Sequence, residues 1–215
     1  MAPSHQQSAQ EAEPKMPLRE DQLPLSTTPL ETARLLLRMP RETDLDAIYE
    51  LHADPVTNRF SPGGLLGSRA AAETLLQGWL AHWQVQGFGY WAIALREQPD
   101  ELIGLGGIMS RPVAGQPGLY LYFRFRPQHW GQGYASEMAQ AALALAFEQL
   151  QAGAVQAVVQ PANTPSRKTL DRLGLLLKGS LADVPGQAPS LQYEITAARW
   201  AALPRTPTEP TPFGA

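Results

Sequence analysis

The sequence predicts a mixed α/β fold, in which one sheet of strands is flanked by helices. The first observation is the order of the hydrophobic patterns: one strand, two helices, three strands and then strand–helix units. The second is composition, because hydrophobic residues make up 44% of the 215 residues, enough for a core. The third is the absence of cysteine, which excludes disulfide bonds, thiolate metal sites and a cysteine nucleophile.

The chain from Arg34 to Gly87 predicts one strand and two helices. Three leucines after Arg34 form a short apolar strand, which a Met-Pro pair ends. Thr43 is expected to cap the first helix, and Ser68 the second, which ends near Gly87. The first helix is indicated by the helical spacing of Leu45, Ile48, Tyr49 and His52. The stripe of the second, interpreted as packing, consists of Leu75, Leu76, Trp79, Leu80 and Trp83.

Three strands are expected next. Residues 89–95 and 102–108 flank a polar turn and therefore predict a hairpin. Residues 119–126 alternate strictly, and Pro127 ends that strand. The alternation places Leu119, Leu121, Phe123 and Phe125 on one face, and Tyr120, Tyr122, Arg124 and Arg126 on the other.

The rest of the chain predicts two more strands and two more helices. A long helix begins at Tyr134 and runs to about Gln151, and residues 154–159 form a strand. Pro165 occupies the first position of a short helix that ends at Gly174. Residues 192–197 form the expected last strand.

The expected organisation is one folded domain over residues 30–203 between two tails. Residues 1–29 are polar and punctuated by proline, which favours a flexible leader. Residues 204–215 carry four prolines in twelve positions and favour a disordered tail. The formal charge of −3 argues against generic nucleic-acid binding.

Targeting and metal signals are missing from the sequence. No apolar run approaches the roughly 20 residues of a membrane span, and the N-terminus has no secretory apolar region, so a cytoplasmic protein is expected. The four histidines show no metal-ligand spacing, so no metal is expected.

The segment most informative about chemistry is Gln128-His-Trp-Gly131-Gln-Gly133-Tyr-Ala135, between a strand and the start of a long helix. Two glycines allow a ligand to approach the backbone closely. The helix start offers unpaired N–H groups and a positive dipole end. Together these features suit a pyrophosphate, although a purely structural glycine turn has the same pattern.

Two other nucleotide-binding motifs fit this segment poorly. The pattern from Gly131 to Ser136 lacks the third glycine of the dinucleotide fingerprint, and no acidic residue ends the following strand. A Walker A loop is excluded because the chain has no Gly-Lys-Ser/Thr.

Gln128-x-x-Gly131-x-Gly133 resembles the acyl-CoA motif, Q/R-x-x-G-x-G/A, of the GNAT superfamily of N-acetyltransferases. The flanking residues 127–137 resemble the longer version of that motif. The opening Leu30-Glu-Thr-Ala-Arg-Leu-Leu-Leu-Arg38 is similar to the first strand of the ribosomal-protein (RimJ/RimL-like) branch. Asn163-x-x-Ser166, followed by a Leu-Gly pair, is similar to that branch's second half. The resemblance covers about residues 30–203.

The resemblance implies a mixed sheet that is splayed where acetyl-CoA binds. Backbone groups of the strand at Phe123, Arg124 and Phe125 should bind the pantetheine arm. Amides from Gly131 to Ala135 should hold the pyrophosphate. Asn163 should contact the pantetheine or adenosine, Ser166 should lie near the thioester sulfur, and Arg167 and Lys168 are candidates for the phosphates. The full cofactor set is Phe123, Arg124, Phe125, Gln128, Gly131, Gln132, Gly133, Tyr134, Ala135, Asn163 and Ser166.

Two positions depart from the family pattern. Many relatives carry a catalytic glutamate on the strand before the motif, where this chain has Tyr120. Many carry a tyrosine four residues after Ser166, where this chain has Leu170. The base is therefore elsewhere, or it is water reached through a chain that Tyr120 and Tyr122 order. Ser166, Tyr120 and Tyr122 are the catalytic candidates.

The implied activity is direct transfer of an acetyl group from acetyl-CoA to a primary amine of a protein N-terminus or a small molecule. The missing glutamate equally fits a non-catalytic acyl-CoA sensor, and a structural glycine turn in an unrelated protein is a second alternative. A monomer or homodimer is expected. Arg124 and Arg126 are expected either to face the acceptor and favour amines that carry an acid, or to pair with acids such as Glu194.

Overall fold

The computed structural model describes residues 28–61, 63–113, 115–186 and 188–204. The expected leader lies almost entirely outside the described residues, as does the expected tail beyond Pro204. The strands are β1 (Leu30–Glu31), β2 (Leu35–Arg38), β3 (Tyr90–Leu95), β4 (Gly104–Ser110), β5 (Leu119–Phe125), β6 (Ala154–Val159), β7 (Leu176–Leu181) and β8 (Ser190–Thr196). The α-helices are α1 (Leu45–Ala53), α2 (Pro55–Asn58), α3 (Arg69–Gln86), α4 (Tyr134–Ala144), α5 (Thr164–Arg172) and α6 (Ala197–Ala202).

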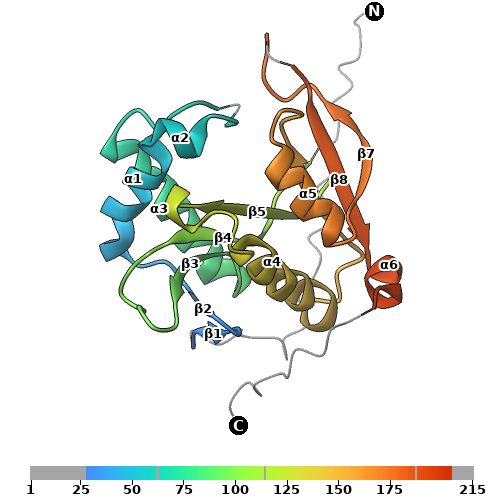
Figure 1. Ribbon diagram of the computed structural model, residues 1–215, viewed down its shortest axis with the longest axis horizontal. Coiled ribbons are helices and arrows are strands. Elements are labelled where there is room, and N and C mark those ends of the chain that lie inside the picture. The colour runs from blue at the N-terminus through green and yellow to red at the C-terminus, as the bar shows by residue number, and fades with distance from the viewer. Residues whose placement is uncertain (1–27, 62, 114, 187, 205–215) are drawn as a thin grey trace, which may run out of the picture.

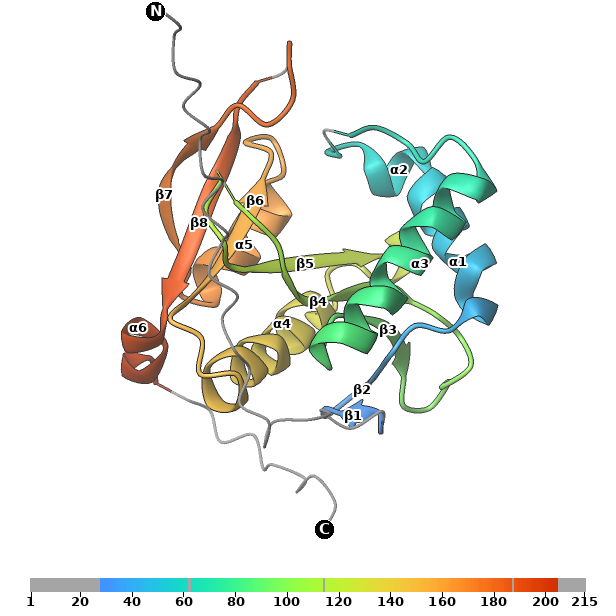
Figure 2. The same cartoon turned by 180° about the vertical axis from the view of Figure 1, so that it is seen from behind.

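The described strands form one eight-stranded sheet in the order β1-β2-β3-β4-β5-β6-β8-β7. β5 and β6 pair in parallel, whereas the other neighbouring strands pair antiparallel. Helix α4 lies on one face of the sheet (Figure 1), and α3 and α1 cover the opposite face (Figure 2). This architecture confirms the mixed α/β prediction, including the hairpin of β3 and β4.

A hydrophobic core lies on each side of the sheet. On the α4 side, Met138 and Leu143 pack against sheet residues such as Ile93 and Val155. On the α1 and α3 side, Trp79 packs within the second core and is 5% exposed. The interpretation of the tryptophan stripe as packing is therefore confirmed.

Most helix ends follow local signals. The Ser68 hydroxyl accepts a hydrogen bond from the Ala71 amide (3.2 Å), and Gly87 ends α3 with φ +73°. The prediction for Thr43 is wrong, because Thr43 lies inside a short 3₁₀ helix and Asp44 precedes α1.

Several elements were not anticipated. β7 is an edge strand whose side chains are mostly exposed, so it lacks the buried alternation by which strands are recognised. The short helices α2 and α6 were also missed. The long helix was expected to reach about Gln151, but α4 ends at Ala144 and a π-helical turn, Leu145–Gln149, follows.

The sheet opens between β5 and β6. These strands pair only at Leu119 with Val155 and at Tyr120 with Gln156. From Leu121 to Phe125, β5 has no partner on that side, whereas β4 pairs with it over its full length. β6 instead pairs with β8 from Ala154 to Val159, and this pair diverges from β5 (Figure 2). The expected splay is thus present, and alternate backbone groups along this edge of β5 are left unpaired.

Candidate acetyl-CoA and acceptor site

The glycine-rich loop connects the open end of β5 to the first turn of α4. Gly131 has φ +74° and nothing within 4 Å of the place where a Cβ would stand. Gly133 has φ +82° and is the residue before the helix. No side chain caps α4, in contrast to α3, α5 and α6. The first amides of α4 are therefore free to bind an anion.

The loop is braced from its outer side by Arg34. Its guanidinium donates to the Gln132 carbonyl oxygen (2.9 Å) and pairs with Glu137 (2.7 Å). Glu137 also accepts from the Thr32 hydroxyl (2.6 Å). Partial burial opposes ionisation, but these hydrogen bonds lower the pKa of Glu137 below its ordinary value. Glu137 therefore has a structural role, since it ties the first turn of α4 to Thr32 and Arg34.

The remaining residues of the cofactor set are divided between exposed loop and core. Gln128 and Gln132 are exposed, and the Gln132 amide donates to the Gln128 carbonyl oxygen (3.0 Å). Phe123 and Phe125 belong to the α4 face of β5. Tyr134 is buried under the Arg34 guanidinium, 4.6 Å from the ring centroid, and Ala135 packs against the same core. Only the backbone of Tyr134 and Ala135 therefore points to the anion site.

Helix α5 carries the second group of candidates. The Asn163 side-chain oxygen accepts a hydrogen bond from the Ser166 amide (3.2 Å), so Asn163 caps the helix. Ser166 is partly buried, and Leu170 is 2% exposed in the core. Arg167 donates to the Pro161 carbonyl oxygen (3.1 Å). Helix α5 contacts α4.

The other face of β5 presents polar side chains to α1 and α2. Tyr120 lies at the last β5–β6 pair, and its hydroxyl is 3.5 Å from the Val158 carbonyl oxygen. Tyr122 is the next residue on this face and lies beyond that pair. Burial raises the pKa of both tyrosines, that of Tyr122 to about 12. Both hydroxyls are therefore protonated at neutral pH.

His52, from α1, is a site residue that sequence reasoning missed. Its Nδ1 lies 2.8 Å from the Ile48 carbonyl oxygen, and its Nε2 lies 3.1 Å from the Tyr122 hydroxyl. Burial, followed by the positive charge of Arg124, lowers its pKa to about 4. Because a carbonyl only accepts, Nδ1 carries the proton and Nε2 accepts from Tyr122. The helical spacing of His52 signalled burial but gave no partner.

The two arginines of this face differ. Arg126 pairs with Glu50 (3.0 Å) and donates to the Leu102 carbonyl oxygen (2.9 Å). Arg124 bonds instead to the side chains of Asn58 and Ser61. The suggested pairing of these arginines with Glu194 is wrong, because Glu194 pairs with Lys178 (3.5 Å).

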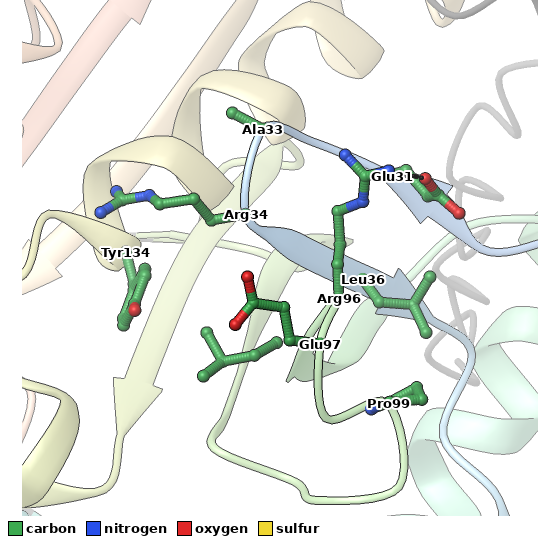
Figure 3. Close-up of a pocket in the computed structure, with 9 residues that line it drawn as sticks. Glu31, Ala33, Arg34, Leu36, Arg96, Glu97, Pro99 and Tyr134 are labelled. Carbon is green, nitrogen blue, oxygen red and sulfur yellow. Dashed lines mark ion pairs between the residues drawn. The ribbon is translucent and has the colours of Figure 1, made fainter.

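A separate surface cavity of about 690 Å³ lies behind the loop, between β1–β2 and the turn after β3. Figure 3 shows the side chains of Arg34, Arg96, Glu97 and Tyr134 around it. Arg96 is paired with Glu31 (2.9 Å) and Arg34 with Glu137, so this cavity offers no unneutralised cation.

Two other kinds of site are not found in the part of the chain that the structure describes. No three His, Cys, Asp or Glu side chains are placed to hold a metal ion. None of its helices is long and apolar enough to cross a membrane.

The fold and this site place the chain in a known class. The family model described as an acetyltransferase (GNAT) domain matches residues 34–176, and the chain belongs to that family. It is an acetyltransferase of the GNAT type.

Individual similarities agree with that assignment. The chain is 28% identical over 155 residues to an uncharacterised N-acetyltransferase, p20, of Bacillus licheniformis, covering 72% of this chain and 85% of the relative. A crystal structure of an acetyltransferase from Agrobacterium tumefaciens has a TM-score of 0.67 and 29% identity to this chain. The match covers 79% of this chain and 95% of that structure. Mycobacterium smegmatis RimJ in complex with CoA-disulfide shares the fold, with a TM-score of 0.60 and 22% identity. The match covers 81% of this chain and 92% of RimJ.

Proposed function

We propose that this chain transfers the acetyl group of acetyl-CoA to a primary amine by direct attack. The observation that carries the proposal is the opening between β5 and β6 beside an uncapped helix start. The opening leaves backbone groups of β5 free for a linear, amide-containing arm, and the helix start leaves amides free for phosphates.

The residues of the loop fit CoA on geometric grounds. The space beside Gly131 is open, and the positive φ angles of Gly131 and Gly133 turn the backbone as side-chain-bearing residues rarely do. The amides from Gly131 to Ala135 would hold the pyrophosphate. The CoA seen with RimJ is consistent with this use of the shared fold.

Other residues of the set would hold the rest of the donor. The backbone of Phe123 and the Phe125 amide would bind the pantetheine arm along the open edge of β5. The Phe125 carbonyl oxygen already accepts from the Trp130 indole (2.7 Å), and the backbone groups of Arg124 face β4. Gln128 would support the loop through its carbonyl oxygen, which already accepts from Gln132. Because the Asn163 oxygen caps α5, its amide nitrogen is the group left for the cofactor. The Ser166 hydroxyl, near the sulfur, would donate to the departing thiolate.

In the reaction, the amine nitrogen bonds to the acetyl carbon, the carbon–sulfur bond breaks, and CoA leaves as the thiolate. Holding donor and amine together supplies up to roughly 7–11 kcal/mol for ideal orientation. A free N–H of β5 would stabilise the negative charge that develops on the carbonyl oxygen. The amine nitrogen must also lose a proton.

The proton leaves through water ordered by Tyr122 in this proposal. The Tyr122 hydroxyl proton is directed to His52, and the Arg124 guanidinium faces the same oxygen. One lone pair of that oxygen is left to accept from the amine or a water. With a pKa of about 4, His52 orients Tyr122 and does not itself hold a proton at neutral pH. An α-amine, with an ordinary pKa near 8, needs less help than a lysine near 10.4, which favours an α-amine acceptor.

The test combines binding and turnover. Calorimetry should show that CoA and acetyl-CoA bind the purified chain, and thiol detection should show acetyl transfer to a panel of α-amines and small primary amines. Binding without transfer to any amine would favour an acyl-CoA sensor instead. Absence of CoA binding would contradict the assignment of the glycine-rich loop.

A further inference from the structure

Arg124 carries a charge that the described part of the chain does not neutralise. No described carboxylate lies within ion-pair distance of its guanidinium. Arg126, two residues further on the same face, is neutralised by Glu50, and the buried Arg38 by Asp44 (2.7 Å). Arg167 is the other partly buried arginine without an ion pair, but it lies on α5, away from this face of β5. A partly buried cation without a counter-ion is costly, so the place of Arg124 on β5 favours an external anion.

The Arg124 guanidinium is nevertheless held in a defined position. It donates to the Asn58 side-chain oxygen and to the Ser61 hydroxyl (3.4 Å). Asn58 is 5% exposed and is itself fixed, because its amide donates to the carbonyl oxygens of Leu51 (3.1 Å) and Asp54 (2.8 Å). Neutral groups therefore fix the orientation of the Arg124 guanidinium without cancelling its positive charge.

The position of Arg124 separates it from the phosphates of CoA. Its side chain lies on the α1–α2 face of β5 with Tyr122, and the guanidinium is 5.7 Å from that ring's centroid. Helix α4 packs on the opposite face of the sheet. In the proposed function the uncapped α4 amides hold the phosphates, which leaves Arg124 available to the acceptor.

We propose that Arg124 binds a carboxylate of the acceptor, and that the acceptors are primary amines with an acidic group near the reacting nitrogen. This inference rests on the proposed function and names its substrate class. Asn58 and Ser61 each take one hydrogen from a different terminal nitrogen of Arg124, so three of its five N–H donors remain. Those three suffice for the two parallel hydrogen bonds that a carboxylate accepts. Polyamines lack the anion and are disfavoured by the same charge.

The experiment uses amidated dipeptides with a free α-amine that differ at one side chain, aspartate against asparagine and glutamate against glutamine. Acetylation is measured with wild type, Arg124→Gln and the matched control Arg126→Gln. Wild type should favour the acid of one pair by about 10- to 100-fold in kcat/KM, mainly through KM. The acid-to-amide ratio should fall toward one in Arg124→Gln and stay high in Arg126→Gln.

Calorimetric affinity of the same peptides for the CoA-loaded protein gives a readout that does not depend on turnover. An equal loss of rate for acid and amide, which leaves their ratio unchanged, overturns the proposal. So does equal affinity for both members of each pair, or no measurable binding of either acid. Acetylation of the amides at rates equal to the acids would uphold the transferase while overturning the subsite.

Discussion

The two faces of β5 carry proposed binding sites of different kinds. On the α4 face, the anion site is made of backbone amides after two glycines, and side chains such as Tyr134 turn into the core. On the α1–α2 face, Tyr122, His52 and Arg124 depend on one another and on Asn58 for their positions. Cofactor binding should therefore be sensitive to backbone conformation, and acceptor use to single side-chain atoms.

The largest effect is expected from Gly131→Val, which tests the backbone half of this contrast. A β-branched residue at φ +74° is strained, and its methyl groups enter the space that the pyrophosphate needs. We expect CoA affinity to fall by about 1000-fold, through strain and lost hydrogen bonds to a charged group. The fold should persist, because nothing lies within 4 Å of the new Cβ.

Calorimetry with CoA and a circular dichroism spectrum together measure this effect. Gln132→Ala is the matched control, because only an exposed side chain is removed. Wild-type CoA affinity in folded Gly131→Val would show that the loop is only a structural turn.

Lowering the pH tests the α1–α2 face of β5, because it protonates His52. Its pKa is about 4 when folded and 6.5 ordinarily, so the unfolded chain binds more protons between these values. The contribution of neutral His52 to the free energy of unfolding is therefore fully present above pH 6.5. It is lost as the pH drops toward 4, by up to about 3 kcal/mol. Urea unfolding of wild type and His52→Gln across pH 4–7 measures it; an equally steep loss in the variant would exclude His52 as the source.

Tyr122→Phe removes one hydroxyl from the same face. We expect kcat/KM for the amine to fall by about 10- to 100-fold, the range for one hydrogen bond to a charged group. CoA affinity should be unchanged, because the uncapped amides of α4 lie on the other face. Steady-state kinetics measure the effect, and a variant as fast as wild type would assign Tyr122 to packing. The same measurement on Tyr120→Phe tests the second tyrosine of this face.

The smallest effect is expected from Asn163→Ala on α5. Loss of the bond to the Ser166 amide should lower the free energy of unfolding by about 1 kcal/mol, as at other helix caps. Thermal unfolding measures this loss, and CoA calorimetry separates the two roles of Asn163. If stability is unchanged while CoA affinity falls, Asn163 is a cofactor residue and not mainly a cap.

Most of the sheet and the glycine-rich loop were predictable because their signals are local. The alternation in residues 119–126 assigned the two faces of β5 correctly, and the glycines marked the start of α4. β7 could not be recognised from its exposed pattern, because its strand conformation comes from pairing with β8.

The sequence by itself determined the fold class, the glycine-rich loop and the family motif, since each depends on residues close together in the chain. Only the tertiary structure showed how side chains meet on the α1–α2 face of β5. His52 and Tyr122 are 70 positions apart and meet because α1 packs on β5. Arg124 and Arg126 look alike in the sequence, yet Glu50 neutralises one and neutral Asn58 holds the other. Charge compensation depends on which helix passes nearby, and no local pattern encodes that.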